Sequence, residues 1–151
     1  MYKRILVPLE NSPYDGVILN HVRSLAKMSS ASLVLLHVAD GFVARNYRQL
    51  NLRESEEMQK DRAYLEELSA ALERDGFDAE PLLGGGDPAE EIVAAAEREH
   101  CDLIAMATHG HRGLQDLIHG STASAVRHTT RIPVLMVRAD PSPPTTDTGS
   151  R

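Results

Sequence analysis

The sequence predicts an α/β fold in which a doubly wound, five-stranded parallel sheet is covered by helices on both faces. Five apolar runs alternate with helical patterns along the chain, and this order is typical of a parallel sheet. Nearly continuous apolar runs, such as RILVPL and SLVLLHV, are typical of strands buried on both faces. With 151 residues, 42% of them hydrophobic, the chain suits one domain with one sizeable core.

The first expected strand spans residues 4–9, and a helix start follows it. Ser12 is expected to cap this helix, with Pro13 at its first position and Asp15 in its first turn, where a carboxylate suits the helix dipole. The second strand is expected over residues 32–38, which read SLVLLHV.

An aperiodic segment and a long charged helix come next. Residues 39–50 show no clear period and are expected to form a loop. The helix expected over residues 52–74 carries a single apolar stripe, and Gly76 stands just past its end. The third strand, over residues 77–83, contains Pro81, and this residue indicates a sheet edge because proline lacks an N–H group.

The second half of the chain is expected to add two helices and two strands. Three glycines over residues 84–86 predict a flexible connection, after which Asp87 caps a helix that has Pro88 at its first position. The remaining elements are a strand over residues 102–107, a helix over 121–129 and an edge strand over 132–138. Residues 140–151 are rich in proline and poor in apolar groups, so the domain is expected to end at residue 139 and a disordered tail to follow.

A glycine-punctuated loop after the fourth strand is the candidate functional segment. Gly110, Gly113 and Gly120 fall within eleven residues, and Ser121 and Thr122 follow at the expected helix start. Glycines allow close approach of another molecule, and the N–H groups and hydroxyls at a helix start can hold an anion. A strand, a glycine loop and a helix in this order are typical of phosphate sites. The alternative is that these glycines serve only turns and packing.

A second candidate segment lies at the end of the first strand. In doubly wound sheets, ligands bind beyond the carboxyl ends of the strands where the strand order reverses. The first and fourth strands are expected to flank this point, which brings Pro8, Leu9 and Glu10 toward the glycine loop. The alternative for Glu10 is a solvated carboxylate that favours the dipole of the next helix.

The composition argues against a nucleic-acid partner, a membrane span and a secreted protein. The net charge of -6 argues against a nucleic-acid partner, which usually needs a basic patch. No apolar run approaches the length of a membrane span, and the N-terminus lacks the pattern of a signal peptide. Cys101 is the single cysteine, so no internal disulfide can form, and we expect a cytoplasmic protein. His109 and His111 have a spacing too common to indicate a zinc site.

Three stretches of the chain carry a family resemblance: RILVPLENS, LLHV and MATHGHRGLQDLIHGSTASAVRHTTRIPVLMVR. With these stretches, the chain resembles the universal stress protein family over roughly residues 2–139. The nucleotide-binding members of the family carry Gly, two residues, Gly, nine residues, then Gly and Ser or Thr. Gly110, nine residues, Gly120 and Ser121 match this spacing, and Ala107 stands where the first glycine would be.

The resemblance implies a fold like that of the adenine nucleotide alpha hydrolases, with strand order 3-2-1-4-5. It also implies a homodimer paired through the last strand, from Ile132 to Arg138, and a bound ATP with or without Mg²⁺. The family usually has Asp where Glu10 stands, so the pocket for the ribose is expected to shift. The implied contacts of the nucleoside and of the triphosphate are carried over to Pro8, Leu9, Glu10, Val38, Met106, Ala107, Gly110, Gly120, Ser121 and Thr122, and His111 and Arg112 are added from their position in the loop.

The sequence favours a protein that holds a nucleotide over one that cleaves it quickly. A phosphoryl-transfer enzyme places a lysine on the phosphates, but the only lysines are Lys3, Lys27 and Lys60, and none lies in the loop. We therefore expect an ATP-binding regulatory or stress-response module without a nucleic-acid or membrane partner. Two alternatives stay open: a dimeric interaction protein of the same fold that binds no nucleotide, as Ala107 and Glu10 allow, and a slow ATPase.

Overall fold

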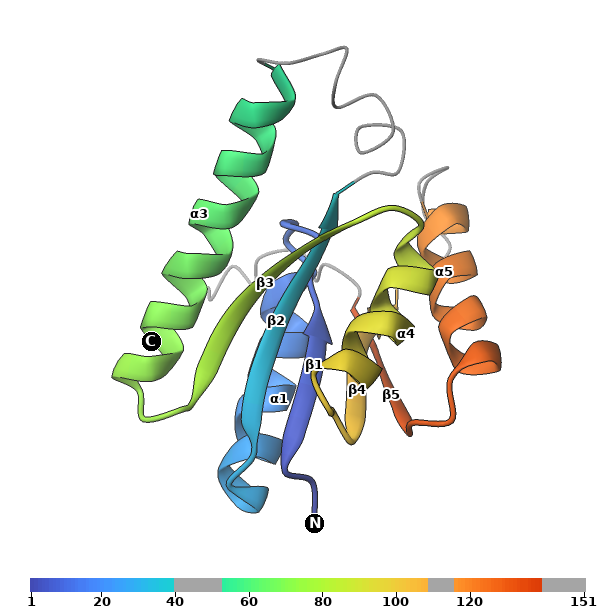
Figure 1. Ribbon diagram of the computed structural model, residues 1–151. Coiled ribbons are helices and arrows are strands. Elements are labelled where there is room, and N and C mark those ends of the chain that lie inside the picture. Colours follow the sequence, from blue (N-terminus) through green and yellow to red (C-terminus); the bar gives the residue numbers. More distant parts are fainter. Residues whose placement is uncertain (40–52, 109–115, 140–151) are drawn as a thin grey trace, which may run out of the picture.

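The computed structural model describes residues 1–39, 53–108 and 116–139, and these residues form a five-stranded parallel sheet flanked by helices (Figure 1). The sheet has the order β3-β2-β1-β4-β5, which confirms the predicted doubly wound fold. The elements of the described chain are β1 (Arg4–Pro8), α1 (Asp15–Ser29), β2 (Ser32–Ala39), α3 (Arg53–Arg74), β3 (Ala79–Gly85), α4 (Pro88–Arg98), β4 (Leu103–Thr108), α5 (Asp116–Thr129) and β5 (Val134–Arg138).

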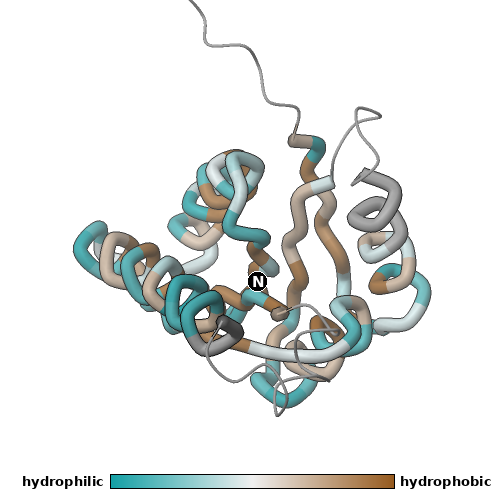
Figure 2. Tube along the Cα trace, turned by 90° about the horizontal axis from the view of Figure 1, so that it is seen from above, coloured by the Kyte–Doolittle hydropathy of each residue, from teal (hydrophilic) through white to brown (hydrophobic). Residues whose placement is uncertain are grey.

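Two apolar layers hold the sheet between its helices. Because successive side chains of a strand point to opposite faces, Ile5 and Val7 of β1 pack on one side and Leu6 on the other. The first layer packs against α1 and α3, and the second against α4 and α5. Figure 2 shows the hydrophobic strands lying between these helices. Ile92, Val93 and Ala96 of α4 are all buried in the second layer.

Both edges of the sheet fall where the sequence placed them. β3 pairs only with β2, and Pro81 lies within it opposite Leu35. β5 pairs only with β4 and forms the other edge. The point of reversal is β1, which pairs with β2 on one side and β4 on the other. The carboxyl ends of β1 and β4 therefore lie next to each other, as expected.

The predicted start of the first helix is wrong. Ser12 is not its cap and Pro13 is not its first residue, because α1 begins at Asp15 after the cap residue Tyr14. The Asp15 carboxylate accepts hydrogen bonds from the backbone N–H groups of Glu10, Asn11 and Ser12. These residues therefore turn around the carboxylate instead of entering the helix.

The predicted start of α4 is confirmed. Asp87 caps α4, since its carboxylate accepts a hydrogen bond from the Glu90 N–H at 3.1 Å, and Pro88 is the first helical residue. The flexible connection predicted over residues 84–86 is wrong for two of its glycines. Gly84 and Gly85 lie within β3, in register with Val38 and Ala39. A side chain at Gly84 would come within 2.7 Å of Glu91 Cγ, so glycine allows α4 to pack closely on this strand.

The predicted start of the last helix is also wrong. α5 begins at Asp116, so Gly120, Ser121 and Thr122 lie inside the helix and not at its N-terminus. A single glycine within a helix costs only about 1 kcal/mol relative to alanine, and residues 116–119 contain no proline to stop it. The loop was expected over residues 39–50, but Ala39 is the last residue of β2. Residues 40–50 of that loop, residues 109–115 of the glycine loop and the tail over 140–151 lie outside the described residues.

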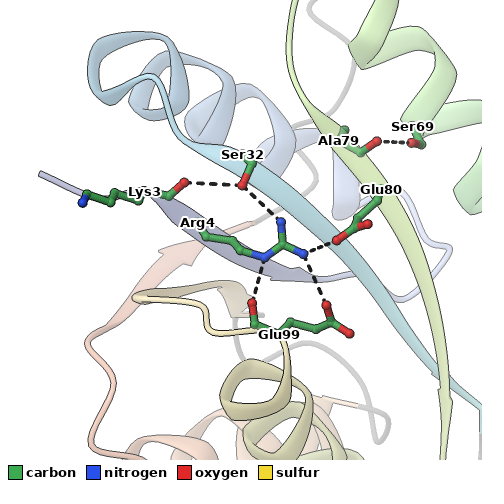
Figure 3. Close-up of polar contacts among 7 residues, drawn as sticks. All are labelled: Lys3, Arg4, Ser32, Ser69, Ala79, Glu80 and Glu99. Atoms are coloured by element: carbon green, nitrogen blue, oxygen red, sulfur yellow. Dashed lines mark hydrogen bonds and ion pairs between the residues drawn. The ribbon is translucent and has the colours of Figure 1, made fainter.

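An arginine network ties the strands together at the end of the sheet opposite to the carboxyl ends (Figure 3). The Arg4 guanidinium donates hydrogen bonds to the Glu99 carbonyl at 2.8 Å and to the Ser32 hydroxyl at 3.3 Å. It also pairs with the carboxylates of Glu80 and Glu99. One side chain on β1 thus links β2, the edge strand β3 and the segment that precedes β4.

Candidate functional site

A pocket opens at the carboxyl ends of β1, β2 and β4, where the strand order reverses. Its volume is about 160 Å³. A single water needs roughly 10–15 Å³ of free volume, so the pocket has room for a much larger group. Its lining residues are Pro8, Leu9, Glu10, Asp15, Leu36, His37, Val38, Pro88, Ile92, Met106, Ala107 and Thr122.

The structure brings seven of the predicted site residues together around this pocket. They are Pro8, Leu9, Glu10, Val38, Met106, Ala107 and Thr122. Gly110, His111 and Arg112 lie outside the described residues. Gly120 and Ser121 belong to α5, but the structure does not describe their side chains.

The walls of the pocket are mainly apolar. Leu36 and Val38 come from β2, Met106 and Ala107 from β4, and Ile92 from α4. Sites for small molecules typically combine such walls with a few polar groups that fix orientation. Leu36, Pro88 and Ile92 also line the pocket, although no motif marks them in the sequence.

Two carboxylates lie at the polar side of the pocket, in very different surroundings. Glu10 is half-buried and accepts a hydrogen bond from the Ser12 hydroxyl at 3.2 Å. Asp15 is only 3% exposed, and its carboxylate binds three backbone N–H groups of the segment that carries Glu10. Glu10 is thus the carboxylate placed to accept hydrogen bonds from a ligand, whereas Asp15 shapes the backbone beneath it.

His37 links the pocket to the long helix α3. Its Nδ1 lies 2.9 Å from the Leu9 carbonyl oxygen, and its Nε2 lies 3.2 Å from a carboxylate oxygen of Asp61 on α3. The side chain of Asn11 donates to the same Asp61 carboxylate at 3.3 Å. Neither His37 nor Asp15 was a predicted site residue, because their partners on α3 are remote in sequence and carry no motif.

Tyr64 of α3 completes the surroundings of Asp15. Its hydroxyl donates to the Asp15 carboxylate at 2.5 Å. Burial, followed by this hydrogen bond and the nearby negative charge, raises the pKa of Tyr64 well above its usual value. The phenol therefore stays a hydrogen-bond donor at neutral pH.

The position of Thr122 changes the argument for an anion site. The free N–H groups of a helix lie in its first turn, and α5 begins at Asp116. Ser121 and Thr122 therefore do not offer the N–H groups of a helix start, as the sequence suggested. Thr122 still lines the pocket, so α5 closes this side of it with a hydroxyl-bearing residue.

The described part of the chain offers neither a cluster of metal-ligating side chains nor a helix that could span a membrane. The described residues contain no group of three or more His, Cys, Asp or Glu side chains that could hold a metal ion. Among the helices that the structure describes, none is long and apolar enough to cross a membrane.

Comparison with known proteins places this fold and pocket in a family. The family model of the universal stress proteins matches residues 1–138. Universal stress protein MJ0577 of Methanocaldococcus jannaschii is 29% identical over 155 aligned positions, which cover 91% of this chain and 96% of that protein. The solved structure of MJ0577 superposes with a TM-score of 0.80 at 31% identity and covers 94% of this chain and 99% of that one.

More distant solved structures share the fold. A universal stress protein solved in complex with cAMP has a TM-score of 0.67 at 20% identity, and it covers 92% of this chain and 98% of that chain. A universal stress protein of Archaeoglobus fulgidus in complex with dAMP has a TM-score of 0.63 at 18% identity, covering 89% and 97%. From the match to the family model over nearly all of its length, the chain belongs to the universal stress protein family.

Proposed function

We propose that this protein binds an adenine nucleotide, ATP in particular, in the pocket at the carboxyl ends of β1, β2 and β4. The observation that carries the proposal is the convergence of Glu10, Val38, Ala107 and Thr122, from four separate segments, on one mostly apolar pocket. Two relatives of the same fold were solved with the adenine nucleotides cAMP and dAMP, and this supports the choice of ligand.

The lining residues suggest how the nucleoside lies. The base packs between the apolar side chains of β2 and β4, close to the backbone of Val38. The Glu10 carboxylate accepts hydrogen bonds from the ribose hydroxyls, since ionised carboxylates are strong acceptors. Pro8 and Leu9 form the adjoining wall.

We assign the phosphates to the other side of the pocket, toward Thr122. There the family motif adds Gly110, Gly120 and Ser121, Arg112 supplies positive charge, and His111 precedes it in the loop. The described residues contain no group of three metal-ligating side chains, so Mg²⁺ enters the proposal only as the counterion of the phosphates.

The proposed role is that of a nucleotide-holding regulatory module in the cytoplasm. No lysine lines the described part of the pocket, so fast phosphoryl transfer is not favoured, and slow hydrolysis remains compatible with the site. The homodimer is proposed to form through the edge strand β5. Bound nucleotide would stabilise the folded protein because it binds only that state.

Denaturing the purified protein and identifying the small molecules released tests the proposal. We expect an adenine nucleotide, or else a saturable rise in the melting temperature when Mg·ATP is added. At a hundred times Kd, the ligand adds about 2.7 kcal/mol to the free energy of unfolding, which gives a shift of several degrees. Finding neither a released nucleotide nor a thermal shift would favour the runner-up, a dimeric interaction protein that binds no nucleotide.

A further inference from the structure

The segment between β1 and α1 is folded around a buried carboxylate. Asp15 Oδ1 accepts the Glu10 N–H at 3.0 Å, and Oδ2 accepts the N–H groups of Asn11 at 2.9 Å and Ser12 at 3.2 Å. With 3% of its surface exposed, Asp15 exchanges almost all of its hydration for these bonds. A carboxylate bound in this way is a strong acceptor that fixes the path of the backbone.

The backbone of this segment leaves the helical and extended regions at Asn11. Asn11 has φ of +60°, in the left-handed region, which asparagine adopts more readily than most residues. The bonds to Asp15 hold Asn11 and its two neighbours in place, and Glu10 is the neighbour that lines the pocket. The direction of the Glu10 side chain therefore depends on the Asp15 carboxylate.

The fourth hydrogen bond of Asp15 comes from a distant part of the chain. The Tyr64 hydroxyl of α3 reaches Oδ2 at 2.5 Å. The raised pKa of Tyr64, due to burial and to this contact, keeps the phenol protonated as a donor. The Asn11 side chain makes a further contact with α3 through Asp61. The segment is thus held by the Asp15 carboxylate through its backbone and by α3 through the Asn11 side chain.

The geometry points to Asp15 as a positioning residue that aims Glu10 at the ribose hydroxyls of the bound nucleotide, with Tyr64 as its support on α3. This inference rests on the proposed nucleotide site and deepens it, because it assigns selectivity for a ribose with free hydroxyls to a residue that makes no contact with the sugar. It predicts that changes at Asp15 alter the discrimination between sugars more than the binding of the base.

Two variants and a matched control separate positioning from stability. Asp15→Asn keeps the shape of the side chain but replaces one carboxylate oxygen with an NH₂ group. When the remaining oxygen accepts the bonds from Asn11, Ser12 and Tyr64, the NH₂ group faces the Glu10 N–H, and that hydrogen bond is lost. Tyr64→Phe removes one hydroxyl hydrogen bond of α3 and leaves the three backbone bonds. Ser69→Ala is the control, because it removes another hydroxyl of α3 that donates to the Ala79 carbonyl at 2.7 Å, away from the pocket (Figure 3).

The measured quantity is the ratio of affinities for adenosine and 2′,3′-dideoxyadenosine, by calorimetric titration of the full chain. We expect Asp15→Asn to lower this ratio by about tenfold, the order expected for a lost hydrogen bond to a charged group. Tyr64→Phe lowers it less, and Ser69→Ala leaves it unchanged even if the protein is less stable. A wild-type ratio in both Asp15→Asn and Tyr64→Phe, or an equal loss in Ser69→Ala, would overturn the inference.

Hydrogen exchange at the amides of Glu10, Asn11 and Ser12 distinguishes failure of this inference from failure of the proposed function. If the wild-type protein binds no adenosine, the nucleotide proposal fails, yet faster exchange at these amides in Asp15→Asn but not in Ser69→Ala still supports Asp15 as the residue that holds the segment. Unchanged exchange in Asp15→Asn contradicts the positioning role whatever the protein binds. If Asp15→Asn does not fold, Tyr64→Phe answers both questions.

Discussion

Glu10 carries the polar half of the proposed binding site. It lines the pocket next to apolar walls and is the pocket carboxylate that a ligand can reach, since Asp15 is buried beneath it. The resemblance to the family implies aspartate at this position, and glutamate extends the same group by one methylene. The proposed contact with the ribose therefore depends on the charge of this side chain as well as its position.

The variant Glu10→Gln tests that dependence. A neutral amide accepts weaker hydrogen bonds than a carboxylate, so we expect the affinity for ATP to fall by about tenfold. Calorimetric titration gives the affinity, and Glu90→Gln, an exposed residue on α4 outside the pocket lining, is the control with the same change of charge. Equal effects in the two variants would argue against a direct contact.

Cys101 is a structural residue in this protein. It is 6% exposed and packs in the apolar layer beneath α4 and α5. Burial raises the pKa of its thiol from 9.0 to about 11, and the carboxylates of Glu99 and Asp102 add to the rise. A thiol with this pKa is protonated at neutral pH, which disfavours a role as nucleophile.

The raised pKa of Cys101 predicts how stability depends on pH. The folded state holds the thiol proton up to about pH 11, whereas the unfolded chain releases it near pH 9.0. The stabilising contribution is therefore complete below pH 9 and is lost as the pH rises toward 11. Urea unfolding of the wild type and of Cys101→Ala should show a difference in free energy that shrinks across this window. A constant difference would contradict the assignment.

Arg4 joins three separate segments at the end of the sheet opposite to the pocket. Its contacts reach β2 at Ser32, β3 at Glu80 and the Glu99 carbonyl before β4. Replacing it leaves a partly buried carboxylate and a carbonyl without their donor. Such losses cost about 1.5–3 kcal/mol for hydrogen bonds to charged groups.

We expect Arg4→Met to lower the free energy of unfolding by about 2 kcal/mol. Arg98→Met is the matched control, because Arg98 is 53% exposed and makes a single 3.4 Å ion pair with Glu91. A surface pair of this kind contributes about 0–1 kcal/mol. Chemical denaturation of both variants measures the difference, and equal losses would show that the network adds no stability beyond one exposed pair.

The strands could be predicted from sequence far better than the ends of the helices. Nearly continuous apolar runs predict buried strands, Pro81 indicates an edge, and the alternation of strands and helices predicts a doubly wound sheet. The full strand order is what the resemblance to the family implies. Ser12 and Pro13 have the sequence of a helix start, but α1 begins only at Asp15, because the Asp15 carboxylate binds the backbone N–H groups of the residues before it. The start of α5 differs from the prediction because glycines are typical of loops, whereas Gly120 lies inside this helix.

The candidate site was predictable where it consists of strand ends. Pro8, Leu9, Val38 and Ala107 follow from the switch point and from the resemblance to the family. The contacts between the pocket and α3 could not be predicted in the same way. His37 contacts Asp61 of α3, and Asp15 accepts a hydrogen bond from Tyr64 of the same helix. The sequence around His37 and Asp15 does not show that this helix lies beside the pocket.

The edge strand β5 is where a second copy of the protein is proposed to pair. Pro133 accepts a hydrogen bond from β4 and Ala139 donates one to it, so alternate residues between them face β4 as well. Val134, Met136 and Arg138 then direct their backbone groups away from the sheet. Met136 is also 37% exposed, as expected for a residue on an open edge.

The variant Met136→Pro tests pairing through this edge. It removes an outward N–H group and spares the bonds to β4, so we expect a folded protein with the mass of a monomer. Met136→Ala, which keeps the N–H group, is expected to remain a dimer. Light scattering after gel filtration gives the mass in solution. A dimer that persists in Met136→Pro would place the interface elsewhere.

We propose that one nucleotide binds where β1, β2 and β4 end, and titration of isotope-labelled protein with Mg·ATP, followed by NMR, tests this site. We expect saturable changes in the amide signals of Leu9, Val38 and Ala107, at one ligand per chain. We expect no change at Lys27 and Gly76, which border a separate groove at the opposite end of the sheet. Unchanged amide signals at Leu9, Val38 and Ala107, or changes confined to the opposite end of the sheet, would contradict binding at this site.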